Sequence, residues 1–148
     1  MSLRFTLSPL LRLRRSVEWQ RGRQLQEATE QLRRTQDSLR QFDHDLAAAK
    51  KRDRDGLTAG RTAAELQFAF LLQENFERNR RRLLADVRRL ELLRQDAVAA
   101  YRLAYREREL LESLCLQRRR AHQQEQQRRE QREVDAMHLA QRWNRPRG

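Results

Sequence analysis

Apolar and small residues recur at alternating steps of three and four along most of the chain. The first stripe contains Leu25, Ala28, Leu32, Thr35, Leu39, Phe42, Leu46 and Ala49. The second contains Leu66, Ala69, Gln73, Phe76, Leu83, Val87, Leu90, Arg94, Ala97, Tyr101, Ala104, Arg108, Leu111 and Cys115. A repeat that averages about 3.5 residues, with charged and amide residues between, is typical of a coiled-coil seam. The pattern therefore predicts two long helices.

A reversal of the chain is predicted where the first stripe stops, in the segment KKRDRDGLTAGRT. Gly56 and Gly60 lie four residues apart there, and paired glycines after a sustained helical pattern mark a turn. At the other end, Ser8 followed by Pro9 is typical of a helix start. The simplest way to bury both stripes is to pack them against each other. We therefore expect an all-α antiparallel coiled-coil hairpin in one domain (1–148), with helix 1 at about 9–54, a turn at about 55–61 and helix 2 at about 62–143.

The second helix is expected to project beyond the first. If the turn is centred on residue 58, residue i lies opposite residue 116 minus i, so that Pro9 faces Glu107. About 35 residues then extend past the partner helix, or about 50 Å at 1.5 Å per residue. The seam positions there are polar, and apolar residues return only at Val134, Ala136, Met137, Leu139 and Trp143. This apolar end is either a docking element or a frayed tail with incidental apolar residues.

Composition fits long helices better than a layered fold. The 148 residues are 38% hydrophobic and 36% charged, with 4 Gly and 2 Pro, which is too little apolar material for a multilayer core. Disorder is the alternative that such a composition allows, and the phased stripes argue against it. The net charge of +12 is concentrated near the termini: residues 1–24 carry six Arg against Glu18, and residues 117–148 carry nine Arg against four acids. Nucleic acid, anionic lipid or an acidic protein surface are the candidate partners of such charge.

No catalytic or metal-binding motif is found in the sequence. Cys115 is the only cysteine, and His44, His122 and His138 are too scattered to chelate a metal. The start of the chain has no apolar run long enough for a signal peptide or a transmembrane segment, because arginines interrupt it. We expect a non-enzymatic, cytoplasmic protein with no cofactor.

Two segments, one at each end of the chain, carry a recognisable pattern. The opening FTLSPLLRLRRSVEWQ places Phe5, Leu7, Leu10, Leu11, Arg14 and Glu18 at a characteristic spacing. The segment YRLAYRERELLESLCLQRRRAHQQEQQRREQREVDAMHLAQR ends in an Asp-containing motif at Asp135. Together they resemble the start and the C-terminal half of the flagellar export protein FliJ family. The similarity extends to chain length and turn position. The family consists of coiled-coil stalks of the type III export ATPase that serve flagellum assembly and motility.

The resemblance implies two protein-binding sites. The basic terminal end would enter the hexameric secretion ATPase, and the candidate residues are Leu10, Leu13, Arg14, Glu18, Arg118, Leu139 and Trp143. The cytoplasmic domain of the export gate protein would bind early in helix 2, at Phe68, Leu72, Phe76 and Asn79. Where family members have a second aromatic set late in helix 1, this chain has Gln41 and Asp45. Export chaperones are further possible partners, and the protein would lie at the cytoplasmic face of the inner membrane while bound to the export apparatus.

Two alternatives stay open at this point. The chain could be the equivalent stalk of a non-flagellar type III secretion system, which shares the architecture. It could also be a basic coiled coil that binds RNA or the ribosome. Trp19 and Trp143 have no aromatic neighbours to form a base-stacking platform, so we expect no specific nucleic-acid partner.

Overall fold

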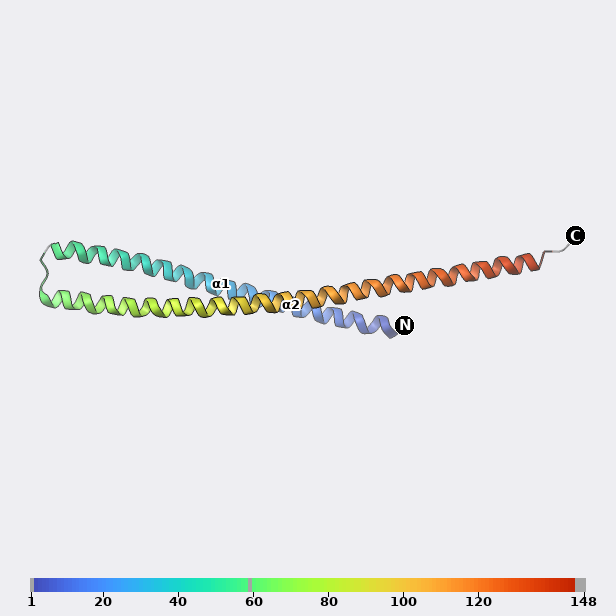
Figure 1. The fold of residues 1–148 in the computed structure, drawn as a ribbon, viewed down its shortest axis with the longest axis horizontal. Helices are drawn as coiled ribbons and strands as arrows, with labels where there is room; N and C mark the ends of the chain where they lie inside the picture. Colours follow the sequence, from blue (N-terminus) through green and yellow to red (C-terminus); the bar gives the residue numbers. More distant parts are fainter. Residues whose placement is uncertain (1, 59, 146–148) are drawn as a thin grey trace. The chain divides into compact units, whose positions relative to one another are not determined.

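The computed structural model describes residues 2–58 and 60–145, and the side chains of residues 7–56 and 60–145. These residues form two helices, α1 (Ser2–Thr58) and α2 (Ala63–Trp143), and no strand (Figure 1). The predicted all-α fold with a longer second helix is confirmed. The chain divides into two compact units: the hairpin unit, Glu18–Leu103, and the terminal unit, Met1–Val17 with Ala104–Gly148. The side chain of Phe5, which was singled out from the sequence, lies outside the described residues.

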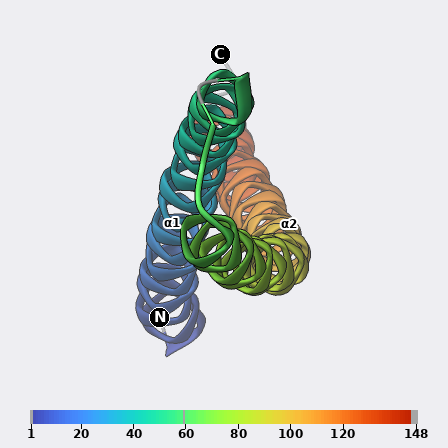
Figure 2. The same cartoon turned by 90° about the vertical axis from the view of Figure 1, so that its left-hand side faces the viewer.

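In the hairpin unit, α1 and α2 run in opposite directions and are joined by a short connection, which faces the viewer in Figure 2. The predicted stripes are the surfaces that pack. All eight positions of the first stripe are buried or half-buried, and Leu32 is only 6% exposed. Leu90, on the second stripe, is 7% exposed. The seam is narrow, so most side chains outside it meet solvent.

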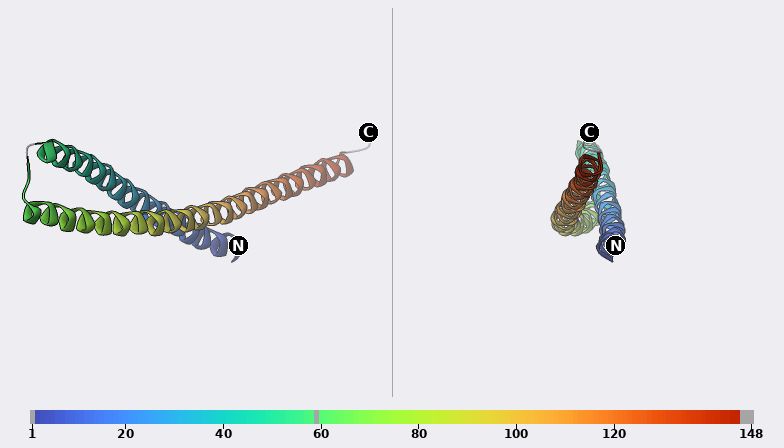
Figure 3. Two further views of the ribbon diagram at one scale, coloured as in Figure 1. Left: turned by 60° about the vertical axis from the view of Figure 1, so that its left-hand side comes forward. Right: turned by 90° about the vertical axis from the view of Figure 1, so that its right-hand side faces the viewer.

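The two helices diverge towards the connection (Figure 3). Leu66 and Gln73 were predicted to lie in the seam, and both are exposed. The prediction is wrong at these two positions because the separated helices no longer cover the stripe of α2. Ala69 and Phe76, on the same stripe, are half-buried.

The register between the helices differs from the predicted one. The Phe42 and Phe76 rings lie 5.6 Å apart, and a β-carbon at Gly22 would lie 3.3 Å from the Tyr101 ring. The predicted register would have placed Glu74 opposite Phe42. The reason is the position of the connection: α1 continues to Thr58 and α2 begins at Ala63, which moves the centre from residue 58 to between residues 60 and 61.

Local contacts explain how the connection is built. Gly60 has a φ of 76°, a left-handed conformation that favours glycine. Gly56 lies inside α1 instead of in the turn. A β-carbon at this position would collide with the guanidinium of Arg61, so glycine leaves room for that side chain, which donates a 2.9 Å hydrogen bond to Asp53. The predicted turn at 55–61 therefore begins too early.

Helix α2 starts with a reciprocal cap. The Thr62 hydroxyl accepts a 3.4 Å hydrogen bond from the Glu65 amide, and the Glu65 carboxylate accepts one of the same length from the Thr62 amide. This capping box satisfies two backbone donors that the first turn leaves unpaired.

In the terminal unit, α1 begins at Ser2, so Pro9 lies inside the helix and the predicted start at Ser8–Pro9 is wrong. A proline inside a helix removes one backbone hydrogen bond and crowds the carbonyl four residues earlier, at a cost of about 3 kcal/mol. Leu7 and Leu11, on either side of it, are half-buried, and their packing favours a continuous helix. Tertiary contact therefore outweighs the local preference for a helix start.

The paired part of the terminal unit is held by a seam and by ion pairs across it. Ala104 is 5% exposed and Leu111 is 9% exposed. Arg14 forms an ion pair with Glu107, where the predicted register had placed Pro9. Counting from this pair, Ser2 lies opposite residue 119. The extension beyond α1 therefore runs from Arg120 to Trp143, about 36 Å at 1.5 Å per residue, and is shorter than the predicted 35 residues.

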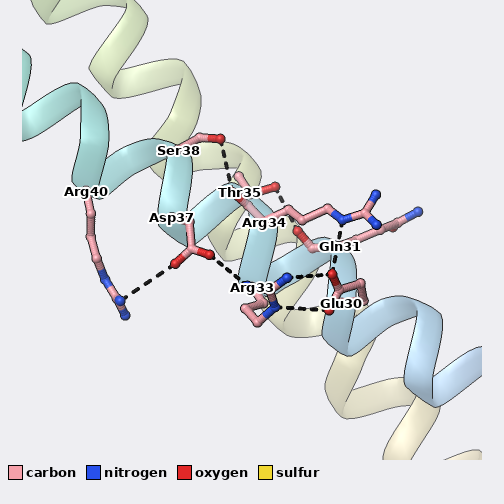
Figure 4. Close-up of polar contacts among 8 residues, drawn as sticks. All are labelled: Glu30, Gln31, Arg33, Arg34, Thr35, Asp37, Ser38 and Arg40. Atoms are coloured by element: carbon pink, nitrogen blue, oxygen red, sulfur yellow. Dashed lines mark hydrogen bonds and ion pairs between the residues drawn. The ribbon is translucent and has the colours of Figure 1, made fainter.

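The exposed face of α1 in the hairpin unit carries a chain of ion pairs (Figure 4). Arg33 donates hydrogen bonds of 2.7 and 3.0 Å to Glu30, and Arg34 donates one of 3.1 Å to the same carboxylate. Arg33 also donates to Asp37 at 3.0 Å. Hydrogen bonds from Arg33 and then Arg34 lower the pKa of Glu30 from 4.5 to about 2. These neighbours three and four residues apart support the helix along its solvent face.

The seam should be far more sensitive to charge than the exposed surface two residues away. Leu90→Asp places a carboxylate at a 7% exposed position and is expected to cost about 3 kcal/mol or more, because the buried charge has no partner. Leu92→Asp is the matched control at a 62% exposed position and should change stability by about 0.5 kcal/mol or less. Thermal unfolding followed by circular dichroism measures both. Equal losses would mean that the seam is not what holds the helices together.

The Glu30 ion pairs predict a defined pH dependence. The pKa of Glu30 is depressed in the folded state, so the carboxylate stabilises the fold fully above about pH 4.5, and this contribution is lost as the pH falls towards 2. Glu30→Gln should therefore lower the melting temperature at neutral pH, and the difference from the unchanged protein should close between about pH 4.5 and 2. Glu27→Gln is the control, because Glu27 makes no ion pair within the described part of the chain. A gap that persists at pH 2 would contradict the assignment.

Candidate protein-binding surfaces

The N-terminal candidates for ATPase binding are only partly free. Leu10 and Leu13 lie on α1 in the terminal unit and are 41% and 58% exposed. Arg14 is half-buried in the ion pair with Glu107, so part of its charge is already used within the chain. Glu18 belongs to the hairpin unit and is half-buried. The predicted set is therefore divided between the two units.

Of the C-terminal candidates, Leu139 and Trp143 lie on the extension of α2, and Arg118 lies two residues before it starts. Every residue from Leu116 to Arg145 is exposed, and Arg118 is among them. Leu139 and Trp143 are 57% and 86% exposed. The single helix thus presents apolar side chains that nothing else in the terminal unit covers.

The predicted gate-binding patch on α2 separates into two parts. Phe68, Leu72 and Asn79 are exposed, whereas Phe76 packs against Phe42 in the seam. Phe68 and Leu72 also line a shallow depression beside the ion pair of Arg61 with Asp53. We therefore assign Phe76 to the core of the hairpin unit and retain the other three as surface residues.

Sequence reasoning missed part of the apolar surface near the connection. Three further apolar side chains lie on other sides of α2 than Phe68. They are Leu66, Phe70 and Leu71, which are 42%, 60% and 57% exposed. The signal was present in the segment LQFAFLL, which is apolar on all sides of a helix, a pattern typical of a segment that needs more than one partner. The side chain of Gln41 donates a 3.0 Å hydrogen bond to Asp45, so these two polar residues satisfy each other instead of providing the aromatic contacts that the resemblance implied.

The charge of the terminal unit is its second main property. Residues 1–17 contain four Arg and no acid, and residues 104–148 contain eleven Arg and seven acids. The terminal unit therefore has a charge of +8, two thirds of the +12 of the whole chain. This net value already counts the acids, including Glu107 and Glu112, which pair with Arg14 and Arg15. Such a surface attracts anionic partners.

Among the described residues, no group of three or more His, Cys, Asp and Glu side chains could hold a metal ion. Over the same residues, no helix is both long and apolar enough to cross a membrane. Cys115 is a half-buried free thiol on the seam, as its place in the stripe predicts.

Comparisons of the chain with models of known protein families, with curated proteins and with solved structures found no match.

The two roles of the phenylalanines on α2 can be separated by mutation. Phe76→Ala removes the ring that packs against Phe42 and should destabilise the hairpin unit by about 2 kcal/mol or more. Phe68→Ala truncates a ring that is 65% exposed and should change the free energy of unfolding by about 0.5 kcal/mol or less. Chemical denaturation of both variants gives the two values. Loss of stability from Phe68→Ala alone would reverse the assignment.

Proposed function

We propose that the chain is a non-enzymatic coiled-coil stalk of a flagellar type III export apparatus. In this role its terminal unit inserts into the hexameric export ATPase, and its hairpin unit contacts the cytoplasmic domain of the export gate protein. The resemblance of both ends of the chain to the FliJ family is what suggests these partners. The protein would then be cytoplasmic and would reach the inner membrane only while bound to the apparatus.

The observation that carries the proposal is the extension of α2. A helix that leaves its partner and ends in exposed Leu139 and Trp143 presents apolar anchors to another protein. Large aromatic and aliphatic side chains of this kind supply most of the binding energy at protein interfaces. The arginines of the terminal unit add electrostatic attraction to an acidic ring protein.

The exposed apolar surface of the hairpin unit supports a second partner. Phe68 and Leu72 lie on one side of α2, far along the chain from the terminal unit. Binding of the gate protein there would leave the terminal unit available to the ATPase. Export chaperones would have to use other surfaces or compete with one of these two.

The proposal predicts that the two sites can be disabled independently. Leu139→Asp with Trp143→Ala should abolish stimulation of the cognate hexameric ATPase at physiological salt but leave gate binding intact. Phe68→Ala with Leu72→Ala should weaken the gate complex by at least about thirtyfold, the equivalent of about 2 kcal/mol, and leave ATPase stimulation intact. Each double variant is the control for the other.

Two outcomes would redirect the assignment. Stimulation of an ATPase from a non-flagellar secretion system, but not of the flagellar one, would place the stalk in that system. Tight RNA binding at physiological salt without any effect on either ATPase would replace the proposal with a nucleic-acid role. Binding that depends mainly on phosphate contacts should instead fall by about three decades between about 50 and 200 mM salt for about six contacts.

A further inference from the structure

The seam of α2 keeps its phase beyond the end of α1. After Leu111 and Cys115, steps of three and four continue to the end of the helix. The positions on this line are Arg118, His122, Glu125, Arg129, Arg132, Ala136, Leu139 and Trp143. In the paired part of the terminal unit the same line includes Ala104 and Leu111, which are 5% and 9% exposed. The face that packs against α1 is therefore the face that continues, uncovered, along the extension.

The return of apolar residues on this line distinguishes it from an ordinary solvated face. Ala136, Leu139 and Trp143 lie on the line, and Leu139 and Trp143 are 57% and 86% exposed. Val134 and Met137 are apolar too, but with 3.5 residues per turn they lie on the opposite side of the helix. A heptad phase that is kept through about four turns of polar residues and then becomes apolar again is suited to a second helix that lies along the whole extension.

The charge on the line limits which helix can lie there. Arg118, Arg129 and Arg132 face outward, and the one acid among them, Glu125, already accepts a 3.3 Å hydrogen bond from Arg129. A second copy of the extension would bring arginines against arginines, and like charges across a coiled coil disfavour pairing. A helix with acids opposite these arginines would gain an attraction along the same length.

We propose that the extension of α2 is one strand of an intermolecular coiled coil, and that its partner is an acidic amphipathic helix of another protein. The partner places carboxylates against Arg129 and Arg132 on the extension and against exposed Arg118 just before it. It places apolar side chains against Ala136, Leu139 and Trp143. It continues the packing that α1 provides in the paired part of the terminal unit. The identity of the protein that supplies this helix rests on the proposed function, whereas the chemistry of the contact does not.

A designed peptide tests this chemistry directly. The probe is a synthetic helix of four heptads with Glu at the positions that face Arg118, Arg129 and Arg132, and Leu at those that face Ala136, Leu139 and Trp143. A scrambled peptide of the same composition is its control. The full chain carries Trp19→Phe, so that Trp143 is the single tryptophan, and its emission should shift to the blue only with the patterned peptide. Equal binding of the scrambled peptide would overturn the proposal.

Matched variants then separate pattern from net charge. Arg118→Glu with Arg132→Glu should weaken the complex by about tenfold, because two attractions become repulsions. Arg120→Glu with Arg145→Glu changes the charge by the same amount away from the seam line and should change affinity by about threefold or less. Leu139→Asp should weaken binding strongly, and Met137→Asp, on the opposite face, should not. Calorimetric titration measures all four, and equal losses from the paired variants would contradict a face-specific contact.

The outcomes also separate this contact from the proposed function. If the chain binds the patterned peptide but does not stimulate an export ATPase, the contact with an acidic helix stands. The hexameric ATPase is then not the protein that supplies this helix. If the chain stimulates the ATPase but does not bind the patterned peptide, the proposed contact with an acidic helix is wrong and the proposed function stands.

Discussion

Everything in this protein depends on one stripe of side chains between two helices. Among the side chains that the structure describes, only four are buried, each with 9% or less of its surface exposed: Leu32, Leu90, Ala104 and Leu111. Each contributes burial of a small or medium apolar side chain, so the stability of either unit is the sum of modest contacts along the seam. Ion pairs across it, such as Arg80 with Asp43 at 2.7 Å, fix the register more than they add free energy, because they are largely solvated.

The sequence predicted the seam well and the geometry around it less well. Period 3.5 is a property of the residues themselves, so the positions that pack could be read directly, from Leu25 to Ala49 on α1 and from Leu83 to Cys115 on α2. The register could not be read in the same way. The register depends on where α1 ends and α2 begins. The positions of the glycines do not show this by themselves, because Gly56 lies inside α1, close to the guanidinium of Arg61.

The candidate sites show the same division. Exposure of Leu139, Trp143, Phe68 and Leu72 agrees with their expected use as contact residues, since all four lie off the packed part of the seam. Phe76 and Arg14 were expected to be available and are instead engaged with Phe42 and Glu107. For a two-helix protein the same residue types serve as core and as interface, and only the register decides which role each side chain takes.

The divergence of the helices near their connection also bears on how the hairpin unit folds. A hairpin that is tightly packed at its turn can close from that end, because the first contacts enclose a short loop. Here the Phe42–Phe76 ring contact encloses 34 residues, and closing a flexible loop of that size costs about 3 kcal/mol of chain entropy before any stacking is gained. The half-buried Arg61–Asp53 ion pair closes a shorter loop, but a single partly solvated ion pair offsets little of that cost. Folding of the hairpin unit therefore favours early helix formation, which shortens the search by stiffening both arms before they meet.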